Sequence, residues 1–301
     1  MGSSRARRPA LPPTERLNSR AEDLDLVSPE EVVRRLHRED EAAVRAVRPA
    51  LREVARAART VVEAFRAGGR LVYVGAGTSG RLAVLDASEC PPTFGVSPSQ
   101  VQAVIAGGRR AMTRAVEGAE DDVEAGAEAL RRLRVGPRDV VCGIAASART
   151  PFVLGALEEA RRREARTVLV CCNPPGARTQ VDHVLLAETG PELVAGSTRL
   201  KAGTATKLIL NALTTTAFVT LGKVYRGRMV DVRPTNAKLR ARSLRMMTEL
   251  TDLGPLAAER LLGEAGHEVK VALAMHFTGL SPREARRRLK HATLRELIAE
   301  R

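Results

Sequence analysis

The sequence has 301 residues, of which 44% are hydrophobic, and this is enough for one large domain, or a larger and a smaller one, with a real core. Tryptophan is absent and aromatic residues make up only 2%, which excludes an aromatic stacking platform for single-stranded nucleic acid. The net charge of +14 first suggests a nucleic-acid partner. The arginines that cause it are spread along the whole chain, however, and suit an anionic small substrate equally well.

The N-terminal segment and the cysteines indicate a cytoplasmic protein. The first 20 residues are rich in Pro, Arg and Ser, contain no apolar signal-peptide core, and are expected to be loosely ordered. No apolar run is long enough to cross a membrane, so no membrane partner is expected. Cys90, Cys142, Cys171 and Cys172 lack the spacing of a zinc site and are expected to be reduced, buried thiols.

Helical periodicity occupies the next stretch of the chain. Ser28 is a candidate N-cap with Pro29 at the first helical position, and Gly68-Gly69 ends the helical pattern. A further long helical pattern covers residues 199 to about 224. From Gly254 onward, two or three short helices are expected to form a small subdomain, with Ser281 as one N-cap.

Short apolar runs bounded by turn residues predict five strands, at residues 70–75, 101–107, 139–145, 166–172 and 182–187. Helical segments lie between most of them, which is typical of a buried parallel sheet. The fold class is therefore α/β with layered helices.

The first strand is followed by GAGTSG at residues 75–80, which matches the glycine fingerprint of dinucleotide-binding folds. Such a site needs an Asp or Glu about 20 residues later to hold the ribose, yet residues 96–111 contain no carboxylate. Arg109 and Arg110 could instead bind a 2′-phosphate, which keeps an NADP enzyme open as an alternative.

Hydroxyl side chains favour a different ligand for this loop. Such side chains follow the first strand, at Thr78-Ser79, and the third strand, within residues 147–150. Others precede the long helix, within residues 196–198. Taken singly, each is explained by helix capping. Taken together, at the carboxyl edge of a parallel sheet, they predict a cradle for a compact sugar phosphate.

Carboxylates near these loops could transfer protons. Glu89 precedes Pro91-Pro92, and we expect it on a proline-stiffened loop close to the glycine loop. An acidic cluster follows at residues 117–122, part of which is expected to start a helix. A paired acid and base is predicted among these groups, and spacing does not say which.

Several segments closely resemble the N-acetylmuramic acid 6-phosphate etherases, which are sugar-isomerase (SIS) domain proteins. They include YVGAGTSGRLAVLDASECPPTFGV (73–96), AVEGAEDD (115–122), DVVCGIAASARTPFV (139–153) and STRLKAGTA (197–205). The likeness runs from about Thr14 over nearly the whole chain. It implies a SIS-type three-layer sandwich with a five-stranded parallel sheet and N-terminal helices. The expected division is a flexible segment 1–20, a sugar-phosphate domain 21–250 with its SIS core at about 61–224, and a helical subdomain 251–301.

The resemblance also implies an activity. Members of the family are lyases that remove D-lactate from N-acetylmuramic acid 6-phosphate during cell-wall recycling, as homodimers and without a metal or nucleotide cofactor. By motif, Glu120 matches the base that removes the C2 proton, and Glu89 matches the acid that protonates the lactyl oxygen. The phosphate and substrate site maps onto Gly77, Thr78, Ser79, Ser147, Arg149 and Thr150, with Ser197, Thr198 and Lys201 as neighbours.

Two departures from the family pattern touch the predicted site. Ala148 stands where the family usually has Gly, so phosphate binding is expected to weaken if that position needs a positive φ. The segment CNPPGA (172–177) also lacks a hydroxyl of the family's CNPGS.

Two rival functions come from other SIS proteins. A non-catalytic sugar-phosphate sensor would not need both Glu89 and Glu120. A SIS transcriptional regulator would need an N-terminal helix-turn-helix, whereas the N-terminal helical pattern here is long and uninterrupted.

Overall fold

A computed structural model describes residues 11–232 and 237–300. The chain forms two compact units. The first runs to Asp86 and resumes over Gln102–Leu213, and the second comprises Ala87–Val101 and the chain from Thr214 onward. The second unit thus includes residues 214–250, which the sequence interpretation placed with the sheet.

The five predicted strands are confirmed and form one sheet of order β2-β1-β3-β4-β5. The strands are β1 (Leu71–Gly75), β2 (Val101–Ile105), β3 (Val140–Ile144), β4 (Arg166–Cys171) and β5 (His183–Leu186). Pairing from β1 through β5 is parallel, with Leu71 beside Val140 and Val140 beside Arg166. β1 and β3 are wholly buried, as expected for central strands covered on both faces.

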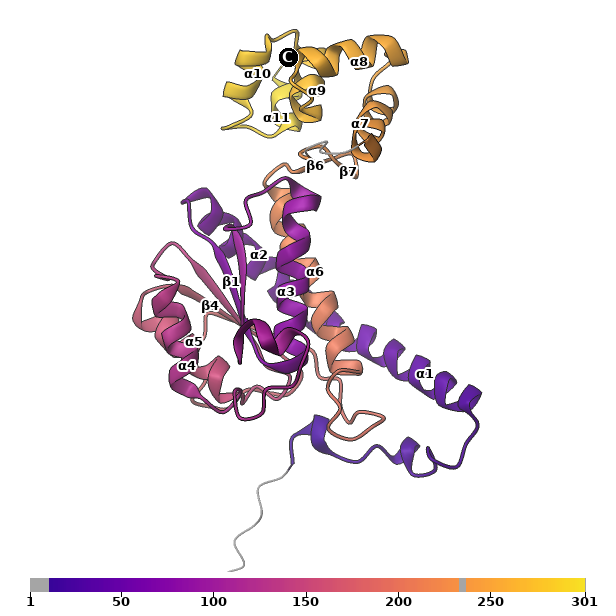
Figure 1. Ribbon diagram of the computed structural model, residues 1–301, viewed down its shortest axis with the longest axis vertical. Helices are drawn as coiled ribbons and strands as arrows, with labels where there is room; N and C mark the ends of the chain where they lie inside the picture. Colours follow the sequence, from indigo (N-terminus) through magenta and orange to yellow (C-terminus); the bar gives the residue numbers. More distant parts are fainter. Residues whose placement is uncertain (1–10, 233–236, 301) are drawn as a thin grey trace, which may run out of the picture. The chain divides into compact units, whose positions relative to one another are not determined.

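Helices cover both faces of this sheet, which gives the three layers that the resemblance implies (Figure 1). On one face α4 (Val123–Arg132) and α5 (Pro151–Arg162) pack with Val72 and Val74 of β1. Tyr73 points to the opposite face, where its buried hydroxyl donates to Asp86 of α3 (Gly77–Phe94) at 2.8 Å. This bond fixes α3 against the strand that precedes it.

The N-terminal helical pattern consists of two helices. α1 (Pro29–Val47) begins at the predicted cap, where the Ser28 hydroxyl accepts from the Glu31 N–H, and α2 is Leu51–Arg66. Between them lies a short 3₁₀ turn, η3 (Arg48–Ala50), that contains Pro49. Proline has no N–H to continue the helix, so the expectation of an uninterrupted pattern was wrong at this residue.

Residues 11–20 make ordered contacts, although the sequence suggested a loose segment over residues 1–20. They contain the 3₁₀ turn η1 (Pro13–Glu15) and the start of η2 (Ser19–Ala21). Thr14 is fully buried, and its hydroxyl accepts a hydrogen bond from the Asn173 side chain at 2.8 Å. Residues 1–10 lie outside the described part of the chain.

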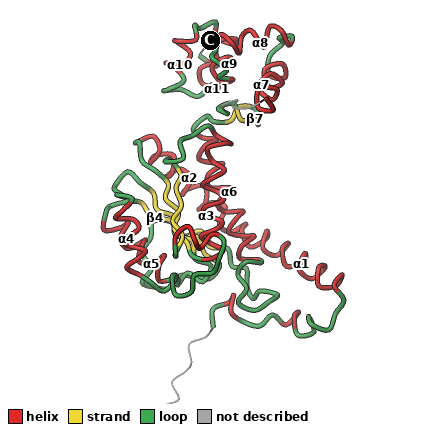
Figure 2. The backbone as a smooth tube through the Cα atoms, in the orientation of Figure 1, coloured by secondary structure: helices red, strands yellow, loops and turns green. Residues whose placement is uncertain are grey.

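The second unit has its own core, in which α9 (Val269–Thr278) is almost entirely buried. Around it lie α7 (Ala237–Leu250), α8 (Pro255–Glu264), α10 (Pro282–Arg288) and α11 (Leu294–Ala299) (Figure 2). Four helices therefore follow Gly254, where two or three were expected, and Ser281 caps α10 as predicted. A hairpin of β6 (Val224–Tyr225) and β7 (Arg228–Met229) precedes α7.

Candidate active site

The strand order predicts a crevice at the carboxyl edge of the sheet, between the two predicted loops that follow β1 and β3. The chain leaves β1 through α3 toward β2, whereas it leaves β3 through α5 toward β4. The loops after β1 and β3 therefore diverge at the carboxyl edge of the sheet, which is where open α/β sheets bind ligands. One loop carries Gly77, Thr78 and Ser79, and the other carries Ser147, Arg149 and Thr150.

The glycines of the GAGTSG loop have two separate roles. A Cβ on Gly75 would lie 2.7 Å from the Gly80 nitrogen, and one on Gly80 would lie 2.5 Å from the Ile105 side chain, so both allow α3 to pack closely on the sheet. Gly77 has a φ of +51°, which L-residues rarely adopt, and open space surrounds the position of its absent Cβ. The chain thus turns into α3 and leaves room above the turn.

The N-terminus of α3 is open toward this room. Among the described hydrogen bonds, none uses the backbone N–H groups of Gly77, Thr78 or Ser79 as donors, and the first one, from Gly80, goes to the Ala76 carbonyl. Thr78 and Ser79 are part-buried, and they belong to the same helical turn as these N–H groups. Free N–H groups, the helix dipole and two hydroxyls together favour a phosphate group.

The loop after β3 is tightly folded. The Arg149 N–H donates to the Ser147 hydroxyl at 3.2 Å, and Thr150 precedes α5 without using its side chain as a cap. Ala148 has a φ of +57° and is 1% exposed. This is the condition under which the sequence predicted that glycine would fit better there, and it places strain inside the candidate phosphate loop.

Glu120 lies in a cavity of about 210 Å³ directly beside the glycine loop. Gly77 and Arg81 line it from the start of α3, and residues 114–120 also line it. The Arg81 guanidinium donates to the carbonyls of Met112 and Arg114, both at 3.2 Å, which holds the loop that carries Glu120. The Glu120 carbonyl accepts from the Phe152 N–H at 2.9 Å and so ties this residue to the first turn of α5.

One member of the acidic cluster has the structural role that capping predicts. The Asp122 carboxylate accepts from the Ala125 N–H at 2.8 Å and caps α4, with Glu124 in the first helical turn. Glu120 precedes this helix and is exposed, so it remains available to a ligand.

The third predicted loop differs from the other two. It leads into α6 (Lys201–Thr220), whose first N–H groups, of Lys201 and Ala202, donate to the fully buried Glu192 carboxylate at 3.0 and 2.9 Å. The Lys201 ammonium, also buried, forms an ion pair with Glu39. The start of α6 is therefore closed, and the ammonium of Lys201 is already engaged.

Burial raises the pKa of Glu192 above its ordinary value, partly opposed by the two backbone N–H donors. Neither Glu192 nor Glu39 was found by the sequence reasoning, because neither belongs to a recognisable motif, and Glu39 lies 162 residues from Lys201. Thr78 remains close to this helix, since a Cβ on Gly203 would lie 3.7 Å from its methyl group. Ser197 and Thr198 are part-buried just before α6.

Glu89 does not lie on a loop, as the sequence suggested. It is within α3, twelve residues after Gly77, and it is exposed. Pro91 and Pro92 are also inside this helix, which continues to Phe94. Each lacks the N–H that would bond the carbonyl four residues earlier, and the helix ends within one turn of them.

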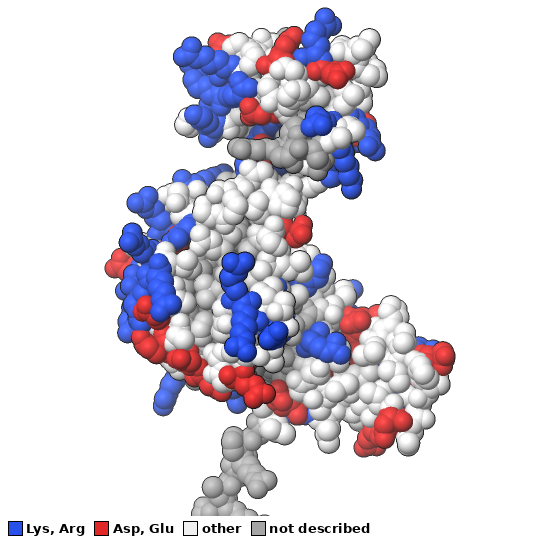
Figure 3. Space-filling view, viewed as in Figure 1, with Lys and Arg blue, Asp and Glu red and all other residues white. Residues whose placement is uncertain are grey.

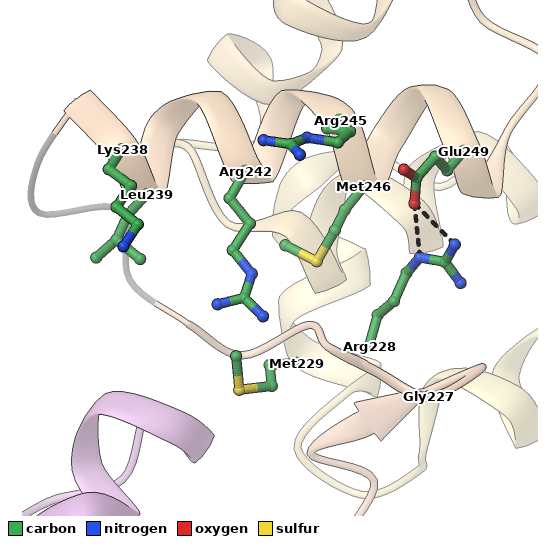
Figure 4. Close-up of a pocket in the computed structure, with 9 residues that line it drawn as sticks. All are labelled: Gly227, Arg228, Met229, Lys238, Leu239, Arg242, Arg245, Met246 and Glu249. Atoms are coloured by element: carbon green, nitrogen blue, oxygen red, sulfur yellow. Dashed lines mark hydrogen bonds and ion pairs between the residues drawn. The ribbon is translucent and has the colours of Figure 1, made fainter.

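The second unit contains a separate basic cavity of about 390 Å³ that the sequence reasoning missed (Figure 4). Lys238, Arg242 and Arg245 of α7 line it, and no ion pair is recorded for them in the described chain. Arg228 also lines it but bonds Glu249 at 2.7 Å. This cavity can attract an anion by its charge, whereas it contains no hydroxyl side chain and no unpaired carboxylate.

On the face seen in Figure 3, Lys and Arg side chains form several separate groups with Asp and Glu among them. This distribution agrees with the interpretation that the basic charge is scattered. Within the described residues, no helix has both the length and the apolar character needed to span a bilayer.

Comparison with known proteins identifies the family. Residues 53–161 match the family model described as the glucokinase regulatory protein N-terminal SIS domain. The N-acetylmuramic acid 6-phosphate etherase of Rubrobacter xylanophilus is 50% identical over 289 residues, which are 95% of this chain and 96% of that protein. The chain belongs to the N-acetylmuramic acid 6-phosphate etherase family.

Another etherase relative, N-acetylmuramic acid 6-phosphate etherase 2 of Vibrio cholerae, is 48% identical over 271 residues, covering 90% of this chain and 88% of that one. The resemblance to the etherases seen in the sequence is thereby confirmed. Among solved structures, a phosphoheptose isomerase from Francisella tularensis is 19% identical with a TM-score of 0.48, over 64% of this chain and 100% of its own.

Proposed function

We propose that this protein removes D-lactate from N-acetylmuramic acid 6-phosphate and leaves N-acetylglucosamine 6-phosphate, in the recycling of peptidoglycan amino sugars. Relatives named as etherases of this substrate align with nearly all of the chain at 48–50% identity. The observation that carries the proposal is the cavity in which a carboxylate residue, Glu120, lies beside the open N-terminus of α3.

The substrate's phosphate would bind at that helix end. The unused N–H groups at residues 77–79, with the hydroxyls of Thr78 and Ser79, supply donors for one face of the phosphate. Ser147, Arg149 and Thr150 belong to the neighbouring loop and supply hydroxyls and a cation. Ser197 and Thr198 are proposed as neighbours, while Lys201 acts only through the field of its buried pair with Glu39.

The chemistry requires a base and an acid. Once the sugar ring opens, the C1 aldehyde acidifies the C2 proton, and the Glu120 carboxylate removes it. The electron pair forms the C2–C3 double bond as the C3–oxygen bond breaks, and Glu89 gives its proton to the departing lactyl oxygen. Glu89 then takes a proton from the water that adds at C3, and Glu120, whose proton has meanwhile exchanged with solvent, delivers a proton to C2.

We also infer that the protein acts as a homodimer in the cytoplasm. Four buried free cysteines, with no disulfide between them, suit a reducing compartment. The dimer is an expectation from the etherase family.

The test is D-lactate release from N-acetylmuramic acid 6-phosphate by the purified protein, without added metal or nucleotide. We expect release by the wild type and none from N-acetylmuramic acid that lacks the phosphate. Binding of the sugar phosphate without lactate release by the wild type would contradict the etherase and indicate a sensor.

A further inference from the structure

The proposed substrate carries a second negative group besides its phosphate. This is the carboxylate of the D-lactyl ether, which distinguishes N-acetylmuramic acid 6-phosphate from N-acetylglucosamine 6-phosphate. Three bonds of about 1.5 Å join C3 of the sugar to the carboxylate carbon, so these two atoms are at most about 4 Å apart. C3 is bonded to C2, where Glu120 is proposed to act. The lactyl carboxylate therefore belongs in or beside the cavity that contains Glu120.

This cavity has room for the lactyl group but also contains charges that oppose it. Its volume is about 210 Å³, whereas a water molecule in the liquid occupies about 30 Å³, so a group of several atoms fits. Glu117 lines the cavity as well as Glu120, and two carboxylates repel a third. A bound lactyl carboxylate therefore needs a cation in the same cavity.

Two arginines line the cavity, and only one of them is already engaged. Nε and Nη2 of Arg81 donate to the carbonyls of Met112 and Arg114, both at 3.2 Å. Arg114 is exposed, and its guanidinium has no hydrogen bond or ion pair recorded within residues 11–232 and 237–300. Arg149, the cation proposed for the phosphate, does not line this cavity. Among the described residues, Arg114 is thus the cation available for a second anion here.

The backbone of Arg114 is held in place while its side chain stays unengaged. Its carbonyl accepts from Arg81, and its N–H donates to the Arg110 carbonyl at 3.2 Å. Both polar groups of the residue's backbone are therefore bonded within the chain. A guanidinium presents a planar fork of donors that can bind both oxygens of a carboxylate at once. The position thus combines a fixed backbone with a donor group that matches the lactyl carboxylate.

We propose that Arg114 binds the lactyl carboxylate of the substrate and thereby selects N-acetylmuramic acid 6-phosphate over sugar phosphates that lack this group. The inference rests on the proposed function, since it takes the substrate and the role of Glu120 from it. The phosphate at the open end of α3 and the carboxylate at Arg114 then hold the sugar at two points. Two charged contacts restrict how the C2–C3 edge can face the Glu120 carboxylate.

The test compares two ligands that differ only in the lactyl group. N-acetylglucosamine 6-phosphate keeps the sugar and the phosphate, and it is measured as a competitive inhibitor of D-lactate release. In Arg114→Gln, KM for N-acetylmuramic acid 6-phosphate should rise about 10- to 100-fold, because hydrogen bonds between two charged groups are lost. The inhibition constant of N-acetylglucosamine 6-phosphate should be unchanged. The carboxylate has the same charge before and after the ether breaks, so kcat should change little.

Arg109→Gln is the matched control. Arg109 is also an exposed arginine, in the 3₁₀ turn η4 (Gly108–Met112), and it does not line the cavity. Its variant should keep the wild-type values for both ligands, and an equal rise in KM would overturn the inference in favour of a general effect of surface charge. Arg114→Lys keeps the charge without the planar fork, so its KM should lie between those of the wild type and Arg114→Gln.

Two further results for Arg114→Gln would overturn the inference. An unchanged KM would show that the arginine does not bind the substrate. Equal losses for both ligands would show that it contacts the phosphate or the sugar instead of the lactyl group.

Failure of the proposed function is a separate result, because a wild-type protein that releases no lactate contradicts the etherase itself. Calorimetric titration with the same two sugar phosphates then tests Arg114 without turnover. A preference of the wild type for the lactyl compound that Arg114→Gln loses supports the inference. A preference that the wild type lacks, or that the variant retains, overturns it.

Discussion

Two helices that begin in the first unit, α3 and α6, carry hydroxyl side chains at or just before their N-termini, yet these N-termini differ in chemistry. At α6 the first N–H groups donate to Glu192, a carboxylate of the chain itself that is 0% exposed. At α3 the corresponding N–H groups have no described acceptor, and Gly77 leaves open space above them. An internal anion satisfies one helix end, and the other is free for an anion from solution.

The comparison shows why hydroxyls before a helix do not by themselves identify a phosphate site. A helix N-terminus carries partial positive charge and unpaired N–H groups, and whichever anion is positioned there takes them. The deciding residue at α6 lies nine positions upstream of the helix and has no motif of its own. Substitutions at the two helix ends can therefore distinguish the N-terminus of α6, which has a structural role, from that of α3, which is proposed to bind phosphate.

The largest effect on stability is expected from Glu192→Ala at the closed end. The change leaves two buried N–H groups without an acceptor, and we expect a loss of about 3 kcal/mol in the free energy of unfolding. Urea denaturation measures it. Glu188→Ala removes an exposed carboxylate nearby and should stay within about 0.5 kcal/mol, so equal losses in both variants would remove the distinction.

At the open end, Ser79→Ala should affect binding and spare stability. A hydrogen bond to a charged group contributes about 1.5–3 kcal/mol, so KM for the sugar phosphate should rise about 10-fold or more with the unfolding midpoint unchanged. Steady-state D-lactate release measures it. Ser99→Ala, at an exposed hydroxyl, is the control and should keep the wild-type KM. An unchanged KM in Ser79→Ala contradicts the phosphate position.

The raised pKa of Glu192 predicts a dependence of stability on pH. Because burial favours the protonated form, the folded state binds more protons than the unfolded state from the ordinary carboxyl pKa of about 4.3 up to the raised value. The carboxyl's contribution to stability therefore falls as pH rises through this window. As the pH is lowered from 7.5 to 5, the wild type should gain stability relative to Glu192→Gln. A loss of stability relative to this variant over the same range would contradict the assignment.

The smallest effect is expected from Ala148→Gly. Relief of a left-handed alanine, about 1 kcal/mol, is offset by the loss of a buried methyl group, about 0.8 kcal/mol, so the net change should be under about 1 kcal/mol. Ala146→Gly has no such strain to relieve and should destabilise the protein by about 1 kcal/mol. Thermal unfolding of both variants measures the difference, and equal losses would show that Ala148 is not strained.

Most of the sheet could be predicted because each strand is a short apolar run between turn residues. The glycine loop, the Ser28 cap and the Ser281 cap were predicted for the same reason, since local residues determine each of them. Pro49 was overlooked as the break between two helices, and Pro91-Pro92 was interpreted as part of a loop. A proline prevents one backbone hydrogen bond, but the sequence alone does not show whether the helix ends there.

Long-range pairs were beyond the sequence. Lys201 matched a motif neighbouring the phosphate, but its burial with Glu39 depends on segments 162 residues apart. The basic cavity of Lys238, Arg242 and Arg245 likewise forms only when α7 packs over the hairpin that contains Arg228. The roles of Glu89 and Glu120 stay predictions, because the sequence names them by motif and the structure supplies only their positions.

The most direct test of the elimination chemistry is the reaction carried out in D₂O, with mass spectrometry and NMR of the sugar product. If Glu120 removes the C2 proton and water adds across the double bond, N-acetylglucosamine 6-phosphate should carry deuterium at C2. Lactate release with only hydrogen at C2 would contradict exchange at that carbon, and with it the account of Glu120 beside the open end of α3.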